Sequence, residues 1–199
     1  MYFSKIKLFS LLLIFAAATA SAQNFKFLIP DGAIVQYAGS IGYFSAGVNY
    51  EIFGNKRGNI DLMYGFVPGS KGGVLNIATA KFAYKPWAIG LKDWGKVYPF
   101  NPGLFASYTF HKELSLTFPG GQYAHDYYYW SEALRPHLAV SSELELDARK
   151  LLKNTGIRAV GLYIEANTND YYLINYVQNT SALTFDDIFQ LGIGMRVKF

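Results

Sequence analysis

DIFQLGIGMRVKF, residues 187–199, contains the clearest pattern in the chain. From Phe189 to the end, large apolar side chains alternate with polar or small ones at every position. Side chains of a β-strand point to its two faces in turn, so this pattern predicts a strand with two different environments on its two sides. One face carries Phe189, Leu191, Ile193, Met195, Val197 and Phe199, and the other carries Gln190, Gly192, Gly194, Arg196 and Lys198.

This ending resembles the C-terminal strand of bacterial outer-membrane β-barrels, which alternates in the same way and ends on an aromatic residue. In that class the barrel-assembly machinery recognises the terminal Phe, so the resemblance implies that Phe199 is an assembly signal. It further implies a Gram-negative bacterium as the source, the cell outer membrane as the location, and outer-membrane lipid as a partner.

The N-terminus has the three parts of a secretory signal peptide. Lys5 and Lys7 form the positive region, Leu8–Ala18 the apolar core, and Ala20-Ser21-Ala22 a cleavage site of small residues. The apolar run is too short to span a hydrocarbon core of about 30 Å. We therefore expect residues 1–22 to be a signal peptide and residues 23–199 to form one domain, the barrel. The chain has no Cys, which excludes a lipid anchor through Cys and any disulfide.

Composition favours a sheet that faces lipid. Hydrophobic residues make up 51% of the chain and aromatic residues 18%, yet no segment after the signal has the length of a transmembrane helix. This combination is typical of a membrane β-barrel with aromatic girdles, and a soluble β-sandwich is the alternative. The net charge of +4 includes Lys5 and Lys7, so the charge of the remaining chain is too small to favour binding of nucleic acid. We expect a monomer without a cofactor.

Alternation recurs along the chain and predicts six further strands, at residues 39–53, 59–67, 74–85, 103–110, 134–147 and 157–167. One face of each is rich in Leu, Ile, Val, Phe and Tyr, while the other combines Gly and Ala with charged or amide residues. Small and polar side chains suit the narrow interior of a small barrel. Because an open sheet edge is not tolerated in hydrocarbon, the strands must close. The predicted fold is an all-β, closed, antiparallel transmembrane β-barrel.

The number of strands follows from where the termini lie. In this class both termini are periplasmic, so the number is even, and the long connections are external. With His111–Ala133 and Asn169–Asp186 as external loops, the sequence predicts eight strands, with ten as the alternative. We place the missing strand between Trp87 and Tyr98, since a strand at Tyr171–Gln178 would put the longer loop on the wrong side. Residues 24–31 are interpreted as a lead-in that ends in a turn.

Charged residues with the inward parity predict a network inside the barrel. Each buried charge needs a partner, so we expect Glu143 and Glu145 to meet basic residues from other strands, chiefly Arg196 and Lys198. Eight strands leave an interior that side chains just fill, which disfavours a passive pore. The predicted lumen network comprises Lys81, Glu143, Glu145, Glu165, Arg196 and Lys198.

Four residues of one inward face, His137, Ser141, Glu143 and Glu145, are the candidates for catalysis, because a His with a Ser and a carboxylate is typical of nucleophilic hydrolysis. However, His137 and Ser141 lie about 13 Å apart along one strand, so a triad needs partners from neighbouring strands. In size and signal the chain is similar to outer-membrane lipid A deacylases, which have a His–Ser–Glu site. It lacks their closely spaced His-x-Ser motif, so no residue is carried over. The three His have no metal-ligand spacing, and we expect no metal site.

Aromatic residues gather in the two predicted external loops. Such rings form a girdle at the level of the lipid headgroups or a surface that binds a ligand. The residues concerned are Tyr127, Tyr128, Tyr129, Trp130, Tyr171 and Tyr172. The expected function is a structural or binding role through these loops, and the alternative is an outer-membrane enzyme that acts on lipid A or phospholipid.

Overall fold

The computed structural model describes residues 26–114, 116, 131–149 and 152–199. The chain divides into two compact units, residues 1–30 and residues 31–199. In the first unit, the described part contains a 3-10 turn, η2 (Lys26–Leu28). In the described part of the chain, no helix is both long enough and apolar enough to cross a bilayer.

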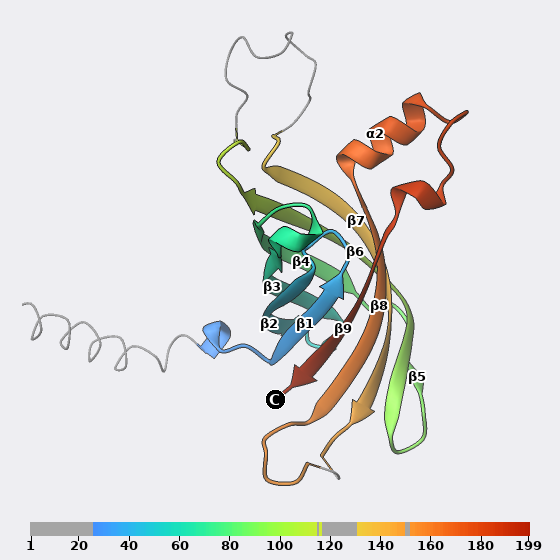
Figure 1. The fold of residues 1–199 in the computed structure, drawn as a ribbon. Helices are drawn as coiled ribbons and strands as arrows, with labels where there is room; N and C mark the ends of the chain where they lie inside the picture. Colours follow the sequence, from blue (N-terminus) through green and yellow to red (C-terminus); the bar gives the residue numbers. More distant parts are fainter. Residues whose placement is uncertain (1–25, 115, 117–130, 150–151) are drawn as a thin grey trace, which may run out of the picture. The chain divides into compact units, whose positions relative to one another are not determined.

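The second unit is a closed barrel of eight antiparallel strands, as the sequence predicts (Figure 1). Each of the eight barrel strands pairs with the next one around the barrel, so β4 pairs directly with β6, and β9 pairs with β1. A ninth strand, β5, has two residues and pairs only with the start of β6. The strands are β1 (Gly32–Ala38), β2 (Phe44–Ile52), β3 (Gly58–Val67), β4 (Leu75–Tyr84), β5 (Ile89–Gly90), β6 (Gly95–Phe110), β7 (Leu134–Asp147), β8 (Ala159–Asn169) and β9 (Gln190–Lys198).

The position predicted for the eighth strand is wrong. That strand is β1, which directly follows the segment interpreted as a lead-in and turn, whereas residues 87–98 contain β5 and the beginning of β6. Ile34 on the inward face of β1 hides the alternation, because an apolar residue there removes the contrast between the faces. In β6, the register shifts between Tyr98 and Asn101 by one residue against β7, so the parity changes within the strand. Because the additional strand comes first in the chain and not fourth, β2, β3 and β4 each run opposite to the predicted direction.

The two ends of the barrel differ in their connections. Gly32 pairs with Lys198, so β1 starts and β9 finishes at the same end, here named the terminus end. The opposite, loop end is where β6 ends and β7 begins, and it carries the connection from β8 to β9. This connection contains two helical segments, α2 (Asp170–Gln178) and η4 (Asp186–Ile188), where the sequence suggested an irregular loop. The side chain of Asn169 caps α2 by accepting a hydrogen bond of 2.9 Å from the backbone N–H of Tyr172.

Apolar side chains fill part of the interior and the β1–β2 turn folds over them. Ile41 in this turn is fully buried, and the hydroxyl of Ser40 donates a 2.5 Å hydrogen bond to Asn167 on β8. The turn lies so close to β3 that a Cβ on Gly65 would come within 1.7 Å of the Ile41 carbonyl oxygen. Only glycine fits there. The buried apolar cluster comprises Ile34, Ile41, Met63, Phe105 and Tyr163.

Candidate functional site

The centre of the lumen holds a four-membered cluster of charges from four parts of the barrel. Arg196 on β9 lies 2.8 Å from the Asp61 carboxylate on β3, and its other terminal nitrogen donates to Glu143 on β7. Glu143 is also 3.0 Å from the ammonium group of Lys85, which directly follows β4. All four side chains are almost completely buried. Their mutual pairing compensates the cost of removing charges from water.

A second cluster lies next to the apolar residues. Lys81 on β4 donates to both carboxylate oxygens of Glu165 on β8, at 2.8 and 2.7 Å, and to the Gln36 side chain at 3.1 Å. The hydroxyl of Tyr163 donates a 2.8 Å hydrogen bond to the same Gln36 oxygen. This cluster ties β1, β4 and β8 together across the interior.

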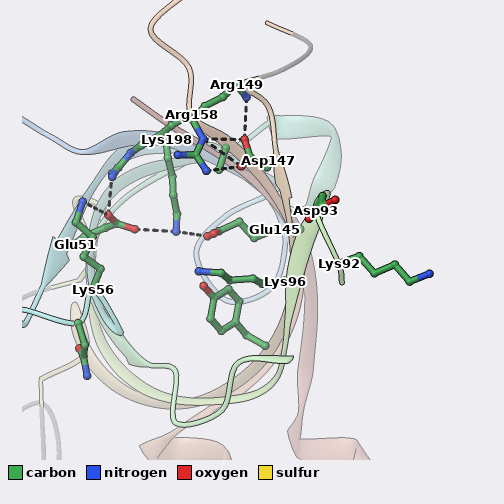
Figure 2. Close-up of a pocket in the computed structure, with 14 residues that line it drawn as sticks. Glu51, Lys56, Lys92, Asp93, Lys96, Glu145, Asp147, Arg149, Arg158 and Lys198 are labelled. Atoms are coloured by element: carbon green, nitrogen blue, oxygen red, sulfur yellow. Dashed lines mark hydrogen bonds and ion pairs between the residues drawn. The ribbon is translucent and has the colours of Figure 1, made fainter. Parts of the chain in front are cut away.

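The third cluster lies at the terminus end, where Figure 2 shows Lys198 between Glu51 and Glu145. The distance from Lys198 to Glu51 is 2.8 Å, and Arg158 lies 2.8 Å from the same carboxylate. Between these side chains and the opening of the barrel is a cavity of about 580 Å³. The lumen is therefore hollow at the terminus end.

All six predicted lumen residues occur in these clusters, with Glu143 against Arg196, Glu145 against Lys198, and Glu165 against Lys81. Sequence reasoning missed the roles of Glu51, Asp61 and Lys85. The inward parity of each residue could have placed it in the predicted lumen network. However, parity gives the face on which a residue lies and not its partner.

The four catalytic candidates are not brought together. His137 instead faces Ser107 on β6, with 2.8 Å between its Nε2 and the Ser107 hydroxyl, and its ring stacks on Phe105. The other ring nitrogen, Nδ1, has no hydrogen-bond partner among the described residues. Ser141 contacts Asn101 at 3.5 Å, and Glu143 and Glu145 are held in the ion pairs above. A contact between a Ser hydroxyl and a His ring is present, but in the described part of the chain no carboxylate hydrogen-bonds to that ring.

Of the loop aromatics, Tyr127, Tyr128, Tyr129 and Trp130 lie outside the described residues. Tyr171 and Tyr172 lie in the first turn of α2. The guanidinium group of Arg135 lies over the Tyr171 ring, 5.6 Å from its centroid. Arg135 also pairs with Asp170 at 3.2 Å, which fastens α2 to β7. Further along this connection, Thr184 donates two hydrogen bonds to the Asp187 carboxylate and thereby lowers the pKa of Asp187.

The arrangement chiefly neutralises charge inside a closed scaffold. Within the described ranges, no group of three or more His, Cys, Asp or Glu residues is placed to hold a metal ion. Comparisons of the chain with protein-family models, with curated proteins and with solved structures found no match.

Proposed function

We propose that this protein is a monomeric outer-membrane β-barrel of a Gram-negative bacterium, exported by a signal peptide at residues 1–22. Its closed interior has a structural role, and its external loops bind a ligand or partner. One observation carries the proposal: every charged residue within the eight barrel strands has the inward parity, so the outward face of the strands carries no charge. These residues are Glu51, Asp61, Lys81, Lys96, Arg135, Glu143, Glu145, Asp147, Glu165, Arg196 and Lys198.

The outward face also supports a hydrocarbon environment by what it does contain. Leucine and isoleucine side chains on β6, β7, β8 and β9 are more than half exposed, among them Leu104, Leu138, Ile164 and Ile193. Water-soluble monomers rarely expose apolar patches larger than a few hundred Å². The closed barrel adds to this support, because it leaves no open sheet edge for lipid to meet.

Exposed aromatic rings lie near both ends of the barrel. Membrane β-barrels carry girdles of aromatic residues at both interfaces, so two belts fit a barrel that spans a bilayer. Near the loop end are Tyr37, Tyr43, Phe44, Phe66 and Phe110, and near the terminus end are Phe53, Trp87, Trp94, Phe100 and Phe199.

The class to which the C-terminal strand is similar keeps its termini in the periplasm, so we assign the loop end to the cell exterior. The connection from β8 to β9 would then stand outside the cell. Its exposed apolar side chains, Tyr171, Val177 and Phe185, support a binding role. Outer-membrane lipid and the barrel-assembly machinery are the partners that this location requires.

Leu162→Arg tests the location, because Leu162 is an exposed outward residue of β8. Near the bilayer midplane an arginine costs about 2–4 kcal/mol of unfolding free energy. The measurement is a urea titration of protein folded into phosphatidylcholine vesicles. Leu152→Arg is the matched control, since Leu152 is an exposed leucine of the β7–β8 connection, outside the strands. Equal effects of the two substitutions would refute a membrane-spanning barrel.

The second candidate function is hydrolysis of lipid A or phospholipid, and the 2.8 Å contact between Ser107 and His137 is the observation in its favour. It ranks second because both residues are buried and face the lumen, away from any acyl chain in the bilayer. Release of fatty acid from purified lipid A, lost in Ser107→Ala, would reverse this order.

A further inference from the structure

We infer that the cavity at the terminus end is a binding site for a small anionic solute, one that carries phosphate or carboxylate groups. This goes beyond the proposed function, which places binding at the opposite end of the barrel. It depends on the shape and charge of the barrel opening and holds whichever environment surrounds the strands.

The cavity has the size and the walls of a ligand site. Its volume of about 580 Å³ lies within the range of about 300–1,000 Å³ usual for small-molecule pockets. Its rim comes from three connections at the terminus end, through Lys56, Lys92 and Arg149, and Tyr98 lines it from β6. In Figure 2, the side chains of Lys96, Glu145 and Lys198 point into the ring of strands.

The charges around the cavity are unequal. Six basic side chains line it against four acidic ones, a surplus of two positive charges. The surplus is unchanged without Lys92 and Asp93, of which Lys92 extends away from the opening in Figure 2. Asp31, which is not part of the lining, lies 3.8 Å from Arg158, and positive charge remains in excess when it is counted.

Around Glu51, several cations depend on one carboxylate. The Glu51 carboxylate is shared by three cations: Lys198 at 2.8 Å, Arg158 at 2.8 Å and Lys56 at 3.4 Å. Lys198 also pairs with Glu145, and Arg158 lies 3.8 Å from Asp31. Lys56, in contrast, makes no second ion pair with a described residue, so an additional anion near this group would meet a cation that is only partly compensated. Because the site lies at the mouth of a closed barrel, low-dielectric walls strengthen the attraction relative to open water.

Lys96 supplies a further cation on the cavity wall. It is exposed and makes no ion pair with any described residue. It pairs in register with Glu145, so both point to the inner face, but the Glu145 carboxylate is already bound by Lys198. Figure 2 shows the Lys96 side chain inside the ring of strands, close to Glu145. An oxyanion bound to Lys96 would complete the charge balance of the cavity, and this fixes the chemical class of the ligand.

The experiment is isothermal titration calorimetry of the detergent-solubilised full-length barrel with pyrophosphate and, separately, with citrate. We expect saturable binding of at least one anion that weakens as sodium chloride is added. Lys96→Gln should weaken it at least tenfold, and Lys96→Arg should retain it. Lys112→Gln is the matched control, because Lys112 is an exposed lysine beyond β6 at the loop end. Preference for pyrophosphate assigns a phosphate ligand, and preference for citrate a carboxylate.

The inference is overturned if the wild-type protein binds neither anion, or if Lys96→Gln binds as tightly as the wild type. Folding of each variant is checked by its heat-dependent mobility in gel electrophoresis. The neutral substitution breaks no ion pair among the described residues, so the variant should fold. Since this titration needs no bilayer, its failure is distinct from failure of the Leu162→Arg test.

Discussion

Single charged residues inside the barrel cannot be removed independently. Glu143 is bound by Arg196 and by Lys85, and in the described part of the chain Lys85 has no other carboxylate within ion-pair distance. Loss of the negative charge would leave the Lys85 ammonium group buried without a carboxylate, next to the Tyr98 ring, whose centroid is 4.4 Å away. Breaking one partner of a buried pair costs far more than replacing the whole pair by apolar groups.

Glu143→Gln should therefore destabilise the barrel by about 3–5 kcal/mol. The measurement is a urea titration in vesicles, compared with the double variant Lys85→Met/Glu143→Gln, in which the stranded cation is also absent. The double variant should regain part of the loss. If Glu143→Gln is as stable as the wild type, the cluster is not a stabilising one. Channel steps of the same variant in a planar bilayer would show that the network also closes the lumen.

How far the sequence predicts the site is clear from two of its residues. Parity alone places Glu143 and Arg196 on the inner face, and the structure pairs them. Parity does not predict that Asp61 joins Arg196, because this depends on the stagger between strands and on how far an Arg side chain reaches across the lumen. Nor does it predict the contact of His137 with Ser107, which lies on a neighbouring strand.

At the scale of elements, strands with strong contrast between their faces could be predicted, and those without it could not. The alternation of β8 and β9 gives their positions to within a few residues, whereas the inward Ile34 obscures β1. Helix α2 was missed because its sequence, DYYLINYVQ, is rich in residues that favour strands. The capping side chain of Asn169 is the local signal that would have indicated its start.

Ser142→Ala tests how the irregular part of β6 is supported. The Ser142 hydroxyl, on the outward face of β7, donates a 2.6 Å hydrogen bond to the Pro99 carbonyl at the register shift. Without water nearby, an unsatisfied carbonyl costs about 1–3 kcal/mol. We expect that loss in a urea titration in vesicles. Ser141→Ala, on the inner face with one weak contact at 3.5 Å, should cost less. Equal costs would argue against a water-free outward face at this point.

At the scale of the whole molecule, closure depends on the last strand. β9 pairs with β8 and with β1, so it joins the two ends of the sheet. Phe199 follows it directly, and its backbone N–H donates a 2.8 Å hydrogen bond to the Asp31 carbonyl. Phe199 is thus held next to Asp31, which directly precedes β1, and the side chain of Phe199 is exposed.

Deletion of Phe199 should block assembly in cells, if the terminal aromatic ring acts as the resemblance to outer-membrane barrels implies. The expected result is loss of the heat-modifiable, membrane-inserted form, measured by fractionation and gel mobility. Phe199→Tyr keeps an aromatic ring and should assemble. Normal yields of inserted protein after the deletion would exclude a role of Phe199 in targeting.

The register shift between Tyr98 and Asn101 changes which residues of β6 face the lumen. Downstream of it odd-numbered residues such as Phe105 face the lumen, and upstream of it even-numbered ones, Lys96 and Tyr98, do so. The extra residue at the shift is what brings Lys96 opposite Glu145. Alternation counted back from Phe105 without it would assign Lys96 to the outward face and Val97 to the lumen. A reading of the sequence that misses the shift therefore places the lysine of the cavity among the apolar side chains of the outward face.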